Sequence, residues 1–214
     1  MSIIDIIKED EGCRLKPYTD TTGHITIGYG RNLSACGISK EEAEFFLKSN
    51  GNKNSKCNLL PQLYYPNIKF DICAKEAKDI LSECKLAILY PILINSSNIH
   101  IGYNRDLTKF GITQEEAEFL FRNDYNEKKF LLNKAIPWVA SKPQGVQDAL
   151  LNMAFNVGVA GLLKFTRFLH ALQNDRIIEA LDALKFNADN TRTKYYTQVP
   201  ARVESICDIL KGKK

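Results

Sequence analysis

The spacing of apolar residues separates an N-terminal part of mixed helix and strand from a C-terminal part that is helical. Ser2 is a candidate N-cap for a short helix whose four isoleucines, between positions 3 and 7, share one face. Residues 14–34 then predict short strands, because Thr-Thr-Gly and two further glycines, Gly28 and Gly30, interrupt them. From residue 143 onward the apolar positions keep helical spacing, over the segments 143–158, 163–174, 175–186 and 199–212.

Two capping boxes mark helix starts in the middle of the chain. Ser39 with Glu42 predicts a helix that runs to about Lys48, followed by the polar, turn-rich stretch SNGNKNSKCN. Thr113 with Glu116 predicts a longer helix that continues to about residue 135. Between the two boxes, residues 75–83 have a helical pattern, and the apolar run LAILYPILI is typical of a strand at an edge or bend because it contains a proline.

The two boxes belong to an internal repeat with a constant offset of 74 residues. Aligning ITIGYGRNLSACGISKEEAEF, from Ile25, with IHIGYNRDLTKFGITQEEAEF, from Ile99, gives thirteen identities in twenty-one positions. Chance would give roughly one or two at ordinary residue frequencies. We call these the first and second copies. The predicted fold class is α+β, with an N-lobe at 1–50, a connecting segment at 51–74, a degenerate repeat of the N-lobe at 75–124 and a helical C-terminal lobe at 125–214.

Composition narrows the class of protein only slightly. The net charge of +4 is spread along 214 residues, which permits contact with an anionic polymer without favouring nucleic acid. The six cysteines form no metal-ligand spacing, so we expect no zinc site and free thiols in a reducing compartment. The N-terminus has no secretory-signal pattern, and the longest apolar run is too short to insert stably in a membrane.

Glu11 and Asp20 are a candidate pair for acid and base chemistry. Glu11 falls at the end of the first predicted helix, where the helix dipole and partial burial disfavour ionisation. Asp20 falls in a turn beside hydroxyl groups at positions 19, 21, 22 and 26, which would keep it ionised. Two carboxyl groups in opposed environments are what glycoside hydrolysis requires. The spacing alone is common, so this hypothesis needs the surrounding residues.

The stretch EGCRLKPYTDTTGHITIGYGRNL resembles the T-even-type phage lysozymes, glycoside hydrolase family 24. The family shows Glu-Gly-x-x-Leu, an aspartate nine residues after the glutamate, a threonine six further on, and Ile-Gly-x-Gly. This chain has them as Glu11, Asp20, Thr26 and the glycines at 28 and 30. The C-terminal stretches QDALLNMAFNVG and YYTQVPARV also look like the family, so the resemblance covers most of the chain.

The resemblance implies a muramidase that cuts the β-1,4 bond between N-acetylmuramic acid and N-acetylglucosamine in bacterial peptidoglycan. Glu11 would be the acid, and Asp20 with Thr26 would place and activate water, with inversion and a carboxyl separation of roughly 6.5–9.5 Å. The remaining matched residues are expected on the two walls of the substrate cleft or beside the acid: Leu33, Phe155 and Asn156 as substrate contacts, and Arg202 reaching Glu11. Core packing is an equal alternative for Leu33 and Phe155.

Two positions depart from the family pattern. Arg31 stands where many relatives have histidine, which predicts a permanent ion pair at that point. Phe168 stands where a small polar cleft residue is usual, which puts one substrate contact in doubt.

The second copy has lost the polar groups of the first. Lys85, Ile94 and His100 stand where the first copy has its glutamate, aspartate and threonine, so we expect a structural or binding lobe there. The family's long helix follows the second copy, and either copy could face the cleft, in a monomer or in a lobe-swapped dimer. If the first copy docks there, Arg202 should reach Glu11. If the second does, Arg202 would meet Lys85, and because two like charges repel, the first arrangement is favoured.

Two other functions stay open at this point. A lytic transglycosylase cuts the same bond without water and needs no second carboxylate, so Asp20 and Thr26 argue against it. A non-enzymatic protein that binds peptidoglycan or inhibits its degradation would have no reason to keep Glu11, Asp20 and Thr26 together. The expected setting is the cytoplasm of a bacterial host, with access to the cell wall through a membrane lesion at lysis.

Overall fold

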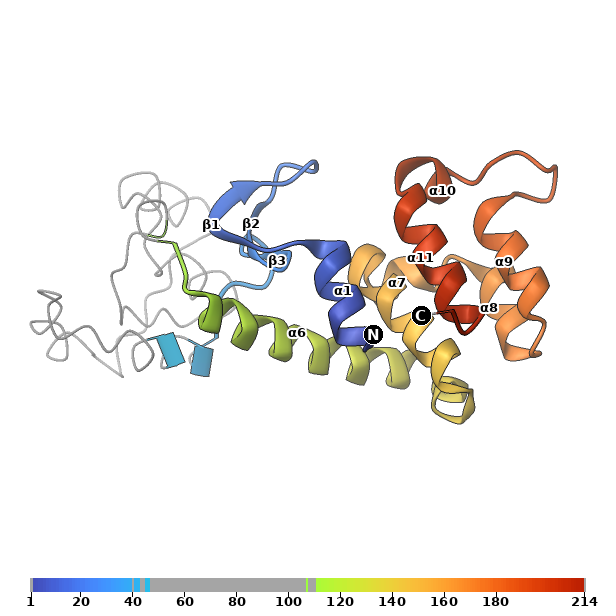
Figure 1. Cartoon of the computed structure of the whole chain (residues 1–214), viewed down its shortest axis with the longest axis horizontal. Helices are drawn as coiled ribbons and strands as arrows, with labels where there is room; N and C mark the ends of the chain where they lie inside the picture. Colours follow the sequence, from blue (N-terminus) through green and yellow to red (C-terminus); the bar gives the residue numbers. More distant parts are fainter. Residues whose placement is uncertain (1, 40, 43–44, 47–106, 108–110, 214) are drawn as a thin grey trace, which may run out of the picture. The chain divides into compact units, whose positions relative to one another are not determined.

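A computed structural model describes residues 2–39, 41–42, 45–46, 107 and 111–213 (Figure 1). The chain divides into two compact units. We call Glu11–Asn123 the hairpin unit, and Met1–Asp10 together with Asp124–Lys214 the helical unit. The predicted α+β class is confirmed, since a small antiparallel sheet is combined with a predominantly helical remainder.

The hairpin unit contains a three-stranded antiparallel sheet in the order β1-β2-β3. The strands are β1 (Arg14–Thr19), β2 (Ile25–Gly28) and β3 (Arg31–Asn32). The predicted interruptions form the turns: Gly23 has φ +87° between β1 and β2, and Gly28 and Gly30 have φ +64° and +81° around the β2–β3 turn. These backbone angles favour glycine because a Cβ is strained there.

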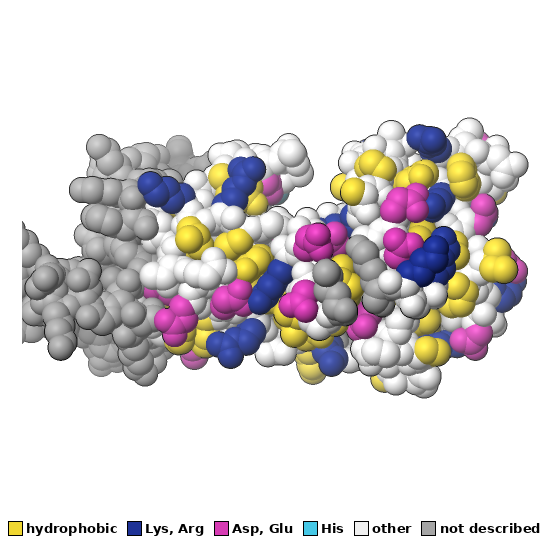
Figure 2. Space-filling model, viewed as in Figure 1, with side chains coloured by type: hydrophobic (Ala, Val, Ile, Leu, Met, Phe, Trp, Pro, Cys, Tyr) yellow, Lys and Arg dark blue, Asp and Glu magenta, His cyan; other side chains and the backbone are white. Residues whose placement is uncertain are grey.

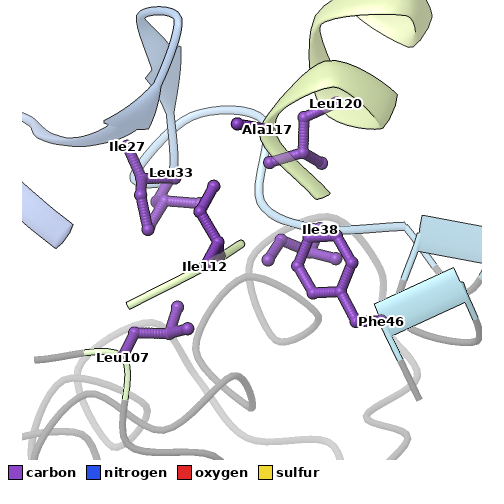
Figure 3. Close-up of a cluster of buried hydrophobic side chains, with 8 residues drawn as sticks. All are labelled: Ile27, Leu33, Ile38, Phe46, Leu107, Ile112, Ala117 and Leu120. Atoms are coloured by element: carbon purple, nitrogen blue, oxygen red, sulfur yellow. The ribbon is translucent and has the colours of Figure 1, made fainter. Parts of the chain in front are cut away.

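One face of this sheet contributes to a buried apolar cluster (Figure 3). Its eight buried members are Ile27, Leu33, Ile38, Phe46, Leu107, Ile112, Ala117 and Leu120. The last two belong to the first turns of α6 (Gln114–Ala135), a helix of 22 residues that begins at the predicted capping box. Thr113 Oγ1 accepts from the Glu116 N–H at 3.1 Å, and the Thr113 N–H donates to Glu116 Oε2 at 2.7 Å. The first box is also formed, between Ser39 and Glu42.

The helical unit is built almost entirely from helices. They are α1 (Ile3–Glu11, of which all but the last residue belong here), the second half of α6, η3 (Pro137–Ser141), α7 (Gln144–Leu162), α8 (Thr166–Gln173), α9 (Ile177–Lys185), α10 (Lys194–Gln198) and α11 (Pro200–Leu210). The pairs α8 with α9 and α7 with α11 lie side by side (Figure 1). Helices α7, α8, α9 and α11 match the four predicted segments, and Gly158, with φ +70°, breaks α7 where the first predicted segment ends.

The first ten residues group with the C-terminal helices, whereas the sequence placed them in the N-terminal lobe. The Ser2 cap is confirmed, because the Asp5 N–H donates to Ser2 Oγ at 3.2 Å. Ile6 and Ile7 are buried on the predicted apolar face. The amide of Asn152 in α7 also donates to Asp10 Oδ2 at 2.8 Å. Burial of this face and the bond to α7 explain why α1 belongs to the helical unit.

The charged surface of the helical unit shows no bias toward one sign on the face in Figure 2, where basic and acidic side chains lie next to one another. Several pairs are in ion-pair contact, such as Arg176 with Glu179 at 3.0 Å and Lys185 with Glu204 at 2.6 Å. Among the described helices, none alone is long and apolar enough to cross a membrane; α7 and α8 meet the criterion only as a pair bent by 113°. Within the same residues, no three metal-ligating side chains gather at one point.

Candidate active site

Glu11 is the last residue of α1, as the sequence predicted. Gly12 follows with φ +65°, the left-handed conformation that ends helices. The Oε1 atom of Glu11 is buried, and Oε2 lies against the Cα of Gly30: a Cβ added at position 30 would be only 2.9 Å from it. The β2–β3 turn therefore leaves room for this carboxyl group only because residue 30 has no side chain.

Asp20 occupies the turn between β1 and β2 and is held by three donors to one oxygen. Oδ1 accepts from the Thr22 N–H at 2.8 Å, from the Thr22 hydroxyl at 2.8 Å and from the His24 N–H at 2.9 Å. The backbone bond from His24, followed by the Thr22 hydroxyl, lowers the pKa of Asp20 below its ordinary value. Of the hydroxyl groups expected to keep this carboxylate charged, Thr22 is the one that binds it.

Thr26 lies on β2, the strand that pairs with β1. It pairs with Tyr18 across the sheet, and Thr19 pairs with Ile25, so the register brings Thr26 beside the turn that holds Asp20. Thr26 is buried, and its hydroxyl donates to the His24 carbonyl at 3.5 Å. The hairpin unit thus contains all three predicted catalytic side chains, each positioned by the sheet or by the helix end before it.

Tyr29 stands between Gly28 and Gly30, and sequence reasoning missed its role. Its hydroxyl donates to Glu118 Oε1 at 2.8 Å and accepts from Gln114 Nε2 at 2.8 Å, both on α6. Burial, and then the hydrogen bond to Glu118, raises the pKa of Tyr29 to about 12. The turn that bounds Glu11 is therefore fastened to α6 by a neutral phenol that stays protonated at neutral pH.

Arg31 forms the ion pair that its departure from the family pattern predicted. Its guanidinium donates to both carboxylate oxygens of Glu42, at 3.0 and 2.7 Å, and both side chains are buried. The same group donates to the Gly37 carbonyl at 3.0 Å, and Asn123 donates to Glu42 at 2.8 Å. This bidentate, hydrogen-bonded pair fixes the end of the sheet to the first capping box.

Arg202 is buried in the helical unit, on α11. Its guanidinium donates to the Asn152 side-chain oxygen at 3.3 Å and to the Asn152 carbonyl at 3.4 Å. Asn152 in turn donates to Asp10, the residue before Glu11. Arg202 and Glu11 belong to different units, so the contact between them stays a prediction, and Lys85 lies outside the described residues.

The residues expected to touch substrate have unequal exposure. Leu33 is only 1% exposed and belongs to the apolar cluster of the hairpin unit, which favours packing over a place on the cleft lip. Phe155 is half-buried, with the Tyr125 ring at 6.3 Å and the Lys128 ammonium at 5.3 Å, and Asn156 is exposed. Phe168, also 1% exposed, is a core residue, so its side chain replaces the usual polar group with packing.

The positions at which the second copy differs from the first, Lys85, Ile94 and His100, lie outside the described residues. Their roles stay predictions.

Comparison with known proteins shows a family resemblance over most of the chain. The family model for phage lysozyme matches residues 8–60 and 91–202, which contain all the predicted site residues. Probable T4-type lysozyme 2 of Dictyostelium discoideum is 26% identical over 192 residues, covering 90% of this chain and 86% of that protein. Probable T4-type lysozyme 1 of the same organism is 23% identical over 195 residues, covering 90% and 86%.

Proposed function

The chain belongs to the phage lysozyme family and is a glycoside hydrolase of the lysozyme type, and from this we propose that it hydrolyses the β-1,4 bond between N-acetylmuramic acid and N-acetylglucosamine in bacterial peptidoglycan. The observation that carries the finer assignment is the contrast between two carboxyl groups of one unit. Glu11 ends a helix with one oxygen buried, whereas Asp20 is kept charged by three hydrogen bonds.

In this proposal Glu11 donates its proton to the glycosidic oxygen as the bond to the anomeric carbon breaks. A water molecule, oriented by Thr26 and activated by Asp20, attacks that carbon from the opposite face and gives its proton to Asp20. The product keeps the inverted configuration. Phe155 and Asn156 would contact the sugar chain, and Arg202 would hold the acid in place. No metal or cofactor takes part in the proposed reaction.

A turbidity assay on permeabilised bacteria tests the activity, and product analysis tests the chemistry. We expect the optical density of the suspension to fall and reducing ends to accumulate. Proton NMR during the first turnovers should show the α-anomer, because a single displacement inverts the β-linkage. A 1,6-anhydro product would instead establish a lytic transglycosylase, and binding to the wall without new reducing ends would establish a non-enzymatic protein.

We propose host lysis as the biological role, with the enzyme held in the bacterial cytoplasm until the membrane is breached. The family match supports this role, whereas the two relatives come from an organism that is not a bacterium, so the role needs its own experiment. Expression in bacteria should leave the cells intact until a membrane-permeabilising agent is added, and lysis should then follow. Lysis without the agent would contradict the proposed compartment.

A further inference from the structure

The core of the hairpin unit is assembled from residues that occupy the same position in the two copies. Six of its eight buried members form three pairs with the repeat offset of 74 (Figure 3). The pairs are Leu33 with Leu107, Ile38 with Ile112, and Phe46 with Leu120. Among the described residues, both copies therefore supply the same positions to one shared core.

The two copies also have the same local backbone where both are described. Gly37 and Gly111, 74 residues apart, have φ +64° and +65°. The capping boxes that follow them have matching bonds from the cap N–H to the glutamate, 2.8 Å to Glu42 and 2.7 Å to Glu116. Glu42 and Glu116 are 2% and 0% exposed. Where their helices begin, the two copies therefore share backbone conformation as well as sequence.

Phe45 and Phe119 are equivalent residues and stack on each other, with ring centroids 4.0 Å apart and planes 5° apart. In a twofold arrangement a residue meets its own equivalent only near the axis, so this stack marks the axis between the copies. We propose that the two copies form a pseudo-twofold pair within one chain, and that the second copy is kept because its helix seats the catalytic hairpin of the first.

The contacts of the hairpin show how this seat works. The N–H of Ile112, just before α6, donates to the Leu15 carbonyl of β1 at 2.8 Å. Gly111 permits this approach, because a Cβ there would lie 2.3 Å from the same carbonyl oxygen. Gly28 lies next to the first turn of α6, since a Cβ added to it would be in van der Waals contact with the Cβ of Ala117, at 3.7 Å. Both strands are thus held at the open end of the hairpin, one by Ile112 and the other by the first turn of α6, and both contacts come from the second copy.

The third attachment leads to the acid itself. Glu118 and Gln114 hold the Tyr29 hydroxyl, and the neighbouring Gly30 lies against Glu11 Oε2. Tyr29, Gln114 and Glu118 are positioning residues, because they touch the turn and leave the chemistry to Glu11. This part of the inference rests on the proposed function. The pairing of the copies does not, and it can be measured without any activity.

A cross-link between the stacked rings tests the pairing directly. In the full chain carrying Phe45→Cys and Phe119→Cys, a short bismaleimide should join positions 45 and 119 within one molecule, as read by peptide mass spectrometry. Phe45→Cys with Phe130→Cys is the matched control, because Phe130 is exposed on the same helix, eleven residues or about 16 Å farther along. Labelling of both introduced cysteines without a 45–119 link, or a link found only between two chains, would overturn the proposal.

Activity variants test the seat. Tyr29→Phe and Glu118→Gln should each lower kcat about tenfold on a soluble peptidoglycan fragment with KM little changed, as expected for loss of a hydrogen bond to a charged group. The double variant should lose no more than either single variant. Glu115→Gln, an exposed carboxylate on the same helix, should stay within about twofold of wild type.

Multiplicative losses in the double variant, or equal losses in the Glu115 control, would overturn the positioning role. An inactive wild type would contradict the proposed function, and the cross-link would still decide the pairing.

Discussion

Glu11 and Asp20 are two carboxyl groups of the same unit in contrasting surroundings. Glu11 is placed by the end of a helix, with one oxygen buried and the other against the bare Cα of Gly30. Asp20 is placed by its own turn, which directs three donors at one oxygen and lowers its pKa. The end of a helix and the Cα of Gly30 therefore determine the surroundings of Glu11. Hydrogen bonds within its own turn determine those of Asp20.

This difference teaches that the two groups can be disturbed separately. The surroundings of Glu11 depend on a glycine nineteen positions away in sequence, whereas those of Asp20 depend on its immediate neighbours Thr22 and His24. Changes near one group should leave the other in place, and each variant should therefore report on one half of the chemistry.

Replacing the proposed acid should have the largest effect. Glu11→Gln keeps the shape of the side chain and removes the proton, so activity in the turbidity assay should fall about 10²–10⁴-fold. Circular dichroism and the melting temperature serve as the control for folding. Activity within about tenfold of wild type would show that Glu11 is not the general acid.

Replacing the proposed base should have the next largest effect. Asp20→Asn can keep all three hydrogen bonds, because they meet at Oδ1, and removes only the charge. We expect a loss of about 100-fold in kcat, with the acidic limb of the pH–rate profile abolished. An unchanged acidic limb would assign that limb to another group and contradict the role of Asp20.

Two glycines provide a matched pair for the surroundings of each carboxyl group. Gly30→Ala and Gly23→Ala both force a Cβ onto a positive φ, +81° and +87°, and each should cost about 1–3 kcal/mol of unfolding free energy. Only the Cβ at 30 would meet Glu11, at 2.9 Å, whereas nothing lies within 4 Å of the one at 23.

Gly30→Ala should therefore also lower activity about tenfold through displacement of the acid. Kinetics and urea unfolding of both variants would measure the two effects separately. Equal activity in the two variants would show that the contact with Glu11 has no catalytic consequence.

Thr22→Val should have the smallest effect on activity, and the effect should appear as a change in the pH dependence. It removes the hydroxyl donor of Asp20 and leaves both backbone donors, so the pKa of Asp20 should rise toward its ordinary value. The acidic limb of the activity profile should move to higher pH by the same amount. Thr21→Val, in the same turn, is the control.

The stability difference between wild type and Thr22→Val should also depend on pH, for the same reason as the activity. A lowered folded-state pKa contributes stability that is fully present above the unfolded value, near 3.9, and is lost as pH falls through the folded value. Wild type should therefore exceed Thr22→Val in stability at neutral pH, and the difference should vanish in acid. A stability difference that persists in acid would instead come from a change in packing.

Local patterns in the sequence predicted most of the secondary structure. The capping boxes at Ser39 and Thr113 form as expected, because both of their hydrogen bonds join residues three positions apart. The position of Glu11 at a helix end and the charge of Asp20 follow from the same short-range logic. Arg31 could be assigned an ion pair, although its partner could not be named.

Contacts between distant residues could not be predicted in this way. Tyr29 meets Glu118 across 89 positions, and Asn152 meets Asp10 across 142, which is why the seat of the hairpin and the grouping of α1 were missed. One signal was available for the first of these: a repeat whose apolar positions are kept while its polar groups are lost indicates shared packing. The short helix α10 was missed because its five residues are too few for a periodic pattern.

The separation between Tyr29 and Glu118 has a consequence for how the protein is made. Closing a chain segment of 89 residues costs about 4 kcal/mol of loop-closure entropy. A ribosome adding about 5–20 residues per second needs roughly 5–18 seconds to make the helix after it has made the hairpin. The β2–β3 turn that carries Tyr29 is therefore synthesised early, and it acquires its hydrogen bond to α6 only when more than half of the protein exists.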